Sequence, residues 1–112
     1  MKTLIYGRLV RSTMSQEIIT DIISGLTAKE RLVYIALLEI CNDYDSDQAW
    51  TQLLGNYCDS LDGKTISGVC SQLSQKGLVI CDNQWGYEEA TITVVALLDN
   101  EDLIGNVDIN SL

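Results

Sequence analysis

The spacing of apolar residues between positions 62 and 77 constrains the fold more than any other feature of the sequence. These residues recur at i, i+3, i+4 and i+7, as Ile66, Val69, Cys70 and Leu73. Such spacing places them on one face of a helix. Asp62 suits the N-cap of that helix, and Gly77 suits its end. We therefore predict a helix from about 62 to 77, with one buried face and one polar face.

Two further helices are predicted upstream. Thr27 and Glu30 have the spacing of a capping box, in which each side chain accepts a hydrogen bond from the other residue's amide. A helix follows to about Cys41, and a polar break occupies 42–47. Residues 48–50 then predict a short strand, with Thr51 as the cap of a second helix. The buried side of that helix is predicted to hold Leu53, Leu54, Tyr57 and Cys58.

A β-hairpin is predicted after Gly77. Residues 78–81 and 90–97 are rich in β-branched and other apolar residues, which favours two strands. The intervening residues 82–89 are turn-rich. Upstream, Leu61 is the single apolar residue of the turn 59–63 and is expected to fill the angle between two helices.

The ends of the chain are predicted to be appendages of this central domain. We divide the chain into an N-terminal segment (1–25), a domain (26–98) and an acidic tail (99–112). The first segment contains a short helix, capped by Ser15, with an apolar stripe that either packs on the core or forms a dimer interface. The stripe consists of Ile18, Ile19, Ile22 and Ile23. The tail holds several aliphatic residues, so we expect it to dock.

The charge of the chain is strongly negative. Seven basic residues stand against 16 acidic ones, for a formal net charge of −9. Residues 26–98 contain four basic and ten acidic residues. A negative field repels phosphate and favours either basic protein partners or simple solubility.

The four cysteines predict neither a metal site nor catalysis. No histidine and no Cys-x-x-Cys pair occurs, so the usual zinc ligand sets are missing. No secretory signal or membrane-spanning run is evident, so we expect a cytoplasmic protein whose four thiols are reduced and buried. No nucleophile with a neighbouring base is recognisable. We expect no enzyme activity, no cofactor and no metal.

Four short motifs, in this order, resemble the winged helix-turn-helix family of bacterial and phage regulators. They span the first helix, the strand running into the second helix, the start of the third helix and the hinge into the hairpin, at 26–31, 50–53, 62–69 and 73–79. A weaker resemblance extends to the N-terminal winged-helix module of phage and plasmid replication proteins. The fold class implied is α+β, with a three-helix core, a wing of two or three strands and an extra N-terminal helix.

The resemblance implies a DNA-binding regulator of transcription or replication, from a phage or other mobile element. In this family the third helix enters the major groove of double-stranded DNA. Carried over residue by residue, its outward candidates are Lys64, Thr65, Ser67, Gly68, Ser71, Gln72, Gln75 and Lys76. Arg8 and Arg11 would form a basic arm, and a homodimer would double the contacts.

Departures from the family pattern leave a second interpretation open. The third helix has no arginine, Asp62 stands at its start, and the wing carries Asp82, Glu88 and Glu89. These features suit an acidic protein-interaction module that inhibits a nucleic-acid-binding complex, as a DNA mimic or adaptor of the anti-CRISPR or anti-restriction kind. Its partner-binding residues would be Asp82, Trp85, Tyr87, Glu88 and Glu89.

Overall fold

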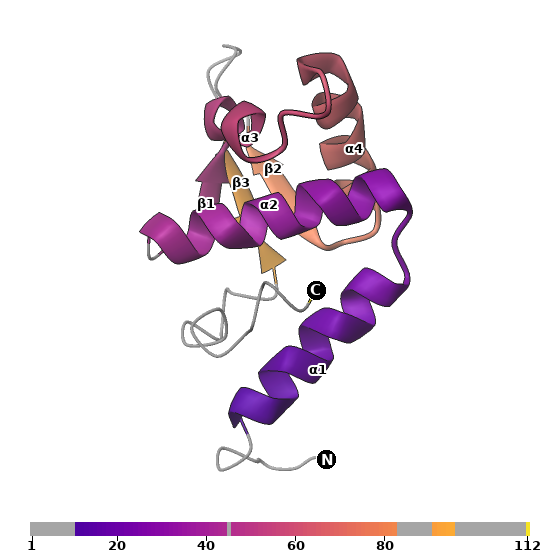
Figure 1. Cartoon of the computed structure of the whole chain (residues 1–112), viewed down its shortest axis with the longest axis vertical. Coiled ribbons are helices and arrows are strands. Elements are labelled where there is room, and N and C mark those ends of the chain that lie inside the picture. The colour runs from indigo at the N-terminus through magenta and orange to yellow at the C-terminus, as the bar shows by residue number, and fades with distance from the viewer. Residues whose placement is uncertain (1–10, 45, 83–90, 96–111) are drawn as a thin grey trace.

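The chain folds into four helices and three short strands (Figure 1). The computed structural model describes residues 11–44, 46–82, 91–95 and 112, with side chains from Gln16 onward. The elements are α1 Arg11–Ser24, α2 Ala28–Tyr44, β1 Gln48–Trp50, α3 Thr51–Tyr57, α4 Gly63–Gln75, β2 Val79–Asp82 and β3 Thr91–Val94. The predicted α+β class is confirmed, and the order of elements is compatible with a winged-helix-like fold.

Helix α2 begins at the predicted capping box. The Thr27 amide donates to Glu30 Oε1 at 3.0 Å, and the Glu30 amide donates to Thr27 Oγ1 at 3.3 Å. The predicted end at Cys41 was wrong, because the helix continues to Tyr44. Residues 42–44 are exposed, so their polarity reflects the solvent-facing end of a helix rather than a loop.

The core forms around α2, which packs against α3, α4 and β1. Helix α4 turns its predicted apolar face inward, and Ile66, Val69, Cys70 and Leu73 are all buried. Leu61 is half-buried and packs against the same core, as expected for the residue in the turn between α3 and α4. Each fully buried side chain of this kind contributes roughly 1.5–3 kcal/mol through removal from water.

The three strands form one antiparallel sheet in the order β1-β3-β2. Ala49 of β1 faces Ile92 of β3, and Val79 of β2 faces Val94 of β3. These four residues are buried, so they form the face of the sheet that covers the core. Ile80, on the opposite face of β2, is half exposed at 51%.

The end of α4 has the geometry predicted for a glycine stop. Gly77 has a φ of 77°. Its amide donates to the Ser74 carbonyl at 3.0 Å, and the Leu78 amide donates to the Leu73 carbonyl at 3.1 Å. These two bonds form a Schellman motif, which requires a left-handed residue at the position of Gly77. The chain thereby leaves the helix and enters β2.

Two predicted helix starts were wrong. Helix α1 begins at Arg11, so Ser15 lies inside it rather than capping it. Thr51 is the first residue of α3, and the N-cap position belongs to Trp50, which makes no side-chain capping bond. A serine or threonine near the first apolar residue of a helix is compatible with several starts within one turn.

The isoleucine stripe of α1 is divided, since Ile19 and Ile23 are buried and Ile18 is 42% exposed.

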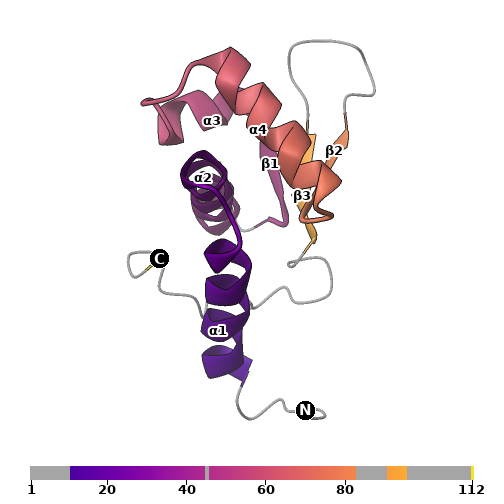
Figure 2. The ribbon, with the colours of Figure 1, turned by 90° about the vertical axis from the view of Figure 1, so that its right-hand side faces the viewer.

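Figure 2 shows α1 extending away from the body formed by the other elements. Several predicted features lie outside the described residues, namely Arg8, the hairpin tip with Trp85, Tyr87, Glu88 and Glu89, and nearly all of the acidic tail. The last residue, Leu112, is half-buried and packs against the core. Within the described ranges, none of the helices has the length and apolarity needed to cross a lipid bilayer.

Candidate functional site

The polar surface of α4 is divided into two flanks. One flank carries exposed side chains at spacings of three and four, Lys64, Ser67, Ser71 and Gln75. The other flank carries Thr65, Gly68 and Gln72, and it turns toward α2. Gly68 and Gln72 are exposed as well, so these predicted residues share one polar face of α4, whose second flank borders α2.

A groove separates the second flank of α4 from the first turn of α2. Its volume is about 540 Å³, and it is lined by Thr27, Ala28, Lys29, Thr65, Gly68, Val69 and Gln72. Lys29 is exposed and is the only charged residue among those that line the groove. Lys29 was absent from the sequence-based candidates, because only the structure brings the start of α2 beside α4.

Gly68 stands within this groove at mid-helix. A Cβ atom built on Gly68 would meet nothing within 4 Å. Glycine in a helix interior is less favourable than alanine by about 1 kcal/mol. No internal contact of the described residues therefore explains the absence of a side chain at this position.

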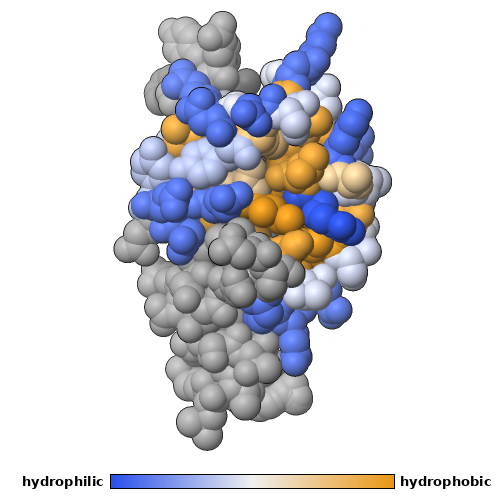
Figure 3. Space-filling view, viewed as in Figure 1, coloured by the Kyte–Doolittle hydropathy of each residue, from blue (hydrophilic) through white to orange (hydrophobic). Residues whose placement is uncertain are grey.

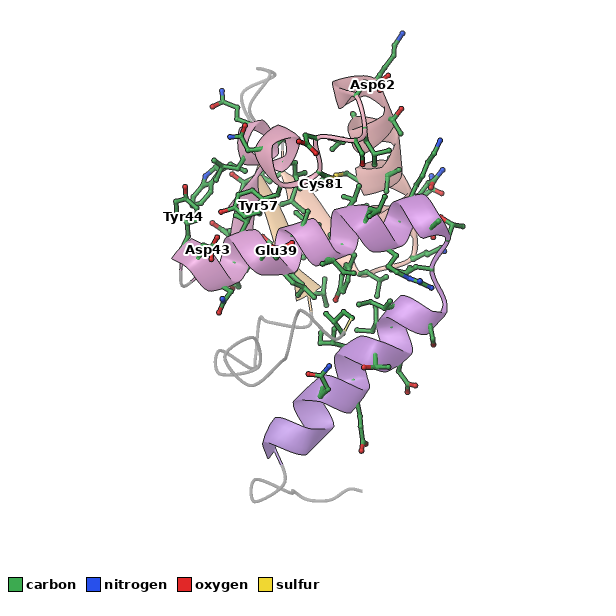
Figure 4. The ribbon with its side chains drawn as sticks, in the orientation of Figure 1. Glu39, Asp43, Tyr44, Tyr57, Asp62 and Cys81 are labelled. Carbon is green, nitrogen blue, oxygen red and sulfur yellow. The ribbon has the colours of Figure 1, made fainter. Side chains whose placement is uncertain are left out.

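Asp62 caps α4, as predicted. Its Oδ1 accepts a hydrogen bond from the Thr65 amide at 2.7 Å. This bond lowers the pKa of the Asp62 carboxyl below its ordinary value of 3.8, and the charge of Lys29 lowers it further. The carboxylate is therefore ionised at neutral pH and places one negative charge at the start of the helix (Figure 4).

Lys76 has a partner within the protein. Its Nζ lies 2.7 Å from Oε1 of the buried Glu30. This ion pair and the bond from the Thr27 amide lower the pKa of the Glu30 carboxyl. A nucleic-acid contact by Lys76 would have to compete with this pair.

Charge is unevenly distributed over the described residues. The basic side chains lie on the first turn of α2 and at the two ends of α4, as Lys29, Arg31, Lys64 and Lys76. Glu39, Asp43 and Asp47 lie on the second half of α2 or before β1, whereas Asp59 and Asp62 lie in the turn between α3 and α4. In Figure 3 hydrophilic side chains cover the C-terminal end of α2, whereas apolar ones lie over its middle.

The C-terminal end of α2 also carries aromatic side chains. Figure 4 shows Asp43, Tyr44 and Tyr57 together at this end of the molecule, far from Asp62. The Tyr57 hydroxyl donates to Asp43 Oδ2 at 2.6 Å, which raises the pKa of Tyr57 to about 12. Tyr44 is 51% exposed and meets Trp50 edge to face, with ring centroids 5.6 Å apart. We call these residues, with Glu39, the acidic-aromatic face.

The cysteines do not form a reactive centre. Burial raises the pKa values of Cys41 and Cys70 to about 12, so both remain protonated thiols. The prediction that all four thiols are buried was wrong for Cys81, which is exposed. Its strand, β2, lies at the edge of the sheet. Among the described side chains, no group of three or more histidine, cysteine or acidic residues is placed to hold a metal ion.

Comparison with known proteins yields little. No protein-family profile and no curated protein sequence matches the chain. One similar solved structure is that of BpsR from Bordetella bronchiseptica, a protein whose DNA binding is regulated by 6-hydroxynicotinic acid. The identity is 17%, the match covers 96% of this chain and 77% of that one, and the TM-score is 0.47. Similarity at this level assigns no function to this chain.

Proposed function

We propose that this chain is a winged helix-turn-helix protein that binds double-stranded DNA to regulate transcription or replication in a phage or other mobile element. In this proposal α3 and α4 form the helix-turn-helix, and the sheet with its hairpin forms the wing. Helix α4 enters the major groove and presents Lys64, Ser67, Ser71 and Gln75 to it.

The separation of charge supports this proposal most. The net charge of −9 argues against DNA binding only if negative charge surrounds α4. Glu39, Asp43 and Asp47 lie instead on the C-terminal half of α2 or just after it, and only Asp59 and Asp62 lie in the turn that leads into α4. At an ionic strength of 0.1 M, charges more than about 10 Å apart are largely screened, so the distant carboxylates act weakly on a phosphate near α4.

The first test is binding to duplex DNA of random sequence, measured by fluorescence polarisation at low salt. We expect measurable binding that weakens steeply as salt is added. Replacing Lys64 and Gln72 together by alanine should abolish it. The matched control is Asn42→Ala, which removes an exposed polar side chain from the acidic end of α2. Absence of wild-type binding at low salt would contradict the proposal.

The acidic-aromatic face supports a second candidate function. Exposed tyrosine beside half-buried tryptophan, with carboxylates around them, is the composition of an interface for a basic protein. The candidate is an acidic winged-helix module that inhibits or adapts a nucleic-acid-binding protein complex. The sequence placed its partner-binding residues at the hairpin tip, whereas the described part of the chain offers Tyr44, Trp50 and Asp43 for that role. Of the original candidates only Asp82, at the end of β2, is described, and it is exposed.

This second function is tested by substitutions that leave α4 untouched. The basic target would be a nucleic-acid-binding enzyme encoded beside this chain, immobilised for a binding titration. Tyr44→Ala should weaken capture of the target, whereas Ser67→Ala on α4 should leave it unchanged. Loss of capture through Ser67→Ala alone would contradict the assignment of the acidic-aromatic face.

Dimerisation belongs to the same proposal. Ile18 of α1 and Leu32 of α2 are 42% and 48% exposed, and apolar exposure of this kind suits a contact with a second copy. Two copies would double a small set of DNA contacts. Sedimentation equilibrium of the wild type and of Ile18→Ser tests this part, and a wild-type monomer at high concentration would contradict it.

A further inference from the structure

We propose that the groove between the first turn of α2 and helix α4 receives the sugar-phosphate backbone of the DNA duplex. In this assignment Gly68 is the point of closest approach, and Lys29 contacts a phosphate. The inference rests on the proposed DNA-binding function and adds a surface to it. It also assigns two roles to α4: the outward flank contacts the base edges, and the second flank contacts the backbone.

The chemistry of the groove fits a phosphate backbone. Its lining provides two hydroxyl groups, from Thr27 and Thr65, one ammonium, from Lys29, and the carboxamide of Gln72. Hydroxyl and ammonium donors of this kind mostly bond phosphate oxygens and sugars in protein–DNA complexes. The Thr27 Oγ1 accepts a bond from the Glu30 amide, so its own proton can be donated to a phosphate oxygen. Ala28 and Val69 give the groove an apolar part that can contact the sugar.

The position of Gly68 also supports a close approach to α4. A side chain at this position would meet nothing inside the protein, and glycine weakens the helix that contains it. At an exposed position inside a helix, most residues with a side chain give a more stable helix than glycine does. Gly55 of α3 is equally unobstructed, but Gly68 also lines the groove, where a body outside the protein can come close to the helix backbone. The groove places that body between α4 and α2.

Charge complementarity identifies the occupant. Lys29 is the single charged residue of the lining, so the groove offers an anion one ammonium partner. Its ammonium is close enough to Asp62 to lower the pKa of that carboxyl. Lys29 lines the groove together with Thr65 of the first turn of α4, so an arriving phosphate would meet the lysine beside that turn. The continuous, anionic body that the proposed function brings to α4 is the DNA backbone.

The test uses two substitutions in the full chain, each with a matched control. Gly68→Ala adds a methyl group to the groove, and Gly55→Ala adds one to α3, where a Cβ also meets nothing within 4 Å. Both should raise the melting temperature by roughly 4 °C, because alanine favours a helix. Only Gly68→Ala should weaken duplex binding, by roughly tenfold. Loss of affinity in a stabilised protein cannot be attributed to misfolding.

Lys29→Gln is the second substitution, and Arg31→Gln is its control. Arg31 is exposed on the same turn of α2 but does not line the groove. Loss of one phosphate contact should reduce the slope of log affinity against log salt by about 1. Arg31→Gln removes the same charge and should change that slope less.

The outcomes separate this inference from the proposed function. Weaker binding by Gly68→Ala but not by Gly55→Ala, and a larger drop in salt slope for Lys29→Gln than for Arg31→Gln, would support it. Wild-type binding that neither substitution alters would overturn the groove assignment and leave DNA binding standing. Equal losses from Gly55→Ala, or displacement of the duplex by polyglutamate at the same charge concentration, would overturn the groove assignment as well. A wild type that binds no duplex at low salt overturns both.

Discussion

The ammonium of Lys76 lies 2.7 Å from Oε1 of Glu30 and joins the C-terminal cap of α4 to the first turn of α2. Glu30 is 3% exposed, and the same Oε1 accepts a hydrogen bond from the Thr27 amide. One carboxylate therefore holds the start of α2 and the end of α4 together. These are the two helices that form the groove, so this contact helps to set its width.

The Glu30–Lys76 pair predicts a dependence of stability on pH. The folded-state pKa of Glu30 lies below its ordinary value of 4.5, so the ionised form stabilises the fold. That contribution is present above pH 4.5 and is lost as pH falls through the folded-state pKa. Glu30→Gln should therefore be less stable than the wild type at pH 7, and the difference should shrink on acidification.

Urea unfolding of both proteins between pH 7 and pH 3 measures this difference. Glu17→Gln is the control, because it removes an exposed carboxylate from α1. A gap between Glu30→Gln and the wild type that stays constant over this range would show that the charge of Glu30 does not stabilise the fold.

Tyr34→Phe is expected to preserve or increase stability. Tyr34 is completely buried, and among the described residues its hydroxyl has no hydrogen-bond partner. A buried polar group left unsatisfied costs about 1–3 kcal/mol, so its removal should stabilise the fold by about 1 kcal/mol. Thermal and urea unfolding measure the change. Tyr57→Phe is the control, since its hydroxyl bonds Asp43 and no gain is expected; a clear loss of stability in Tyr34→Phe would contradict the prediction.

The thiols should differ in reactivity. Cys81 is exposed, whereas Cys41, Cys58 and Cys70 are buried. Burial raises the pKa values of all four thiols, and those of Cys41 and Cys70 reach about 12, which leaves almost no thiolate of these two at pH 8. An aromatic disulfide reagent should therefore modify one thiol per native chain quickly and the others only on unfolding. Cys81→Ser should remove the fast reaction, and fast labelling that persists in this variant would contradict the assignment.

Asp62→Asn should strengthen duplex binding without unfolding α4. Asparagine caps a helix about as well as aspartate, so the bond to the Thr65 amide can be kept while the charge is removed. One fewer negative charge beside the DNA should tighten binding by roughly two- to fivefold at low salt. Glu17→Gln makes the same change of charge on α1 and should have little effect. Equal tightening in both variants would mean that only the net charge matters.

Local features of this fold were predictable because their partners are near neighbours in the sequence. The capping box of Thr27 and Glu30, the cap at Asp62 and the stop at Gly77 each involve residues within one or two helical turns. The inward face of α4 follows from the helical repeat alone. The limits of α1 and α2 were predicted less well, because a run of polar residues suits both a loop and the exposed end of a helix.

The composition of the candidate site depended on contacts between distant parts of the chain. Lys76 was expected to reach DNA, yet its ammonium meets Glu30, 46 positions away. Lys29 and Gly68 line one groove only because α2 and α4 pack together. Cys81 lies on the inner face of its strand by alternation, but its place at the sheet edge leaves it exposed.

The order of elements and their buried faces follow from short-range patterns, since helical period, capping and turn chemistry act over a few residues. Packing decided which charges lie near α4, which lysine is already paired and where a groove forms. Electrostatic and contact energies depend on distances through space, and those distances exist only once the helices have come together.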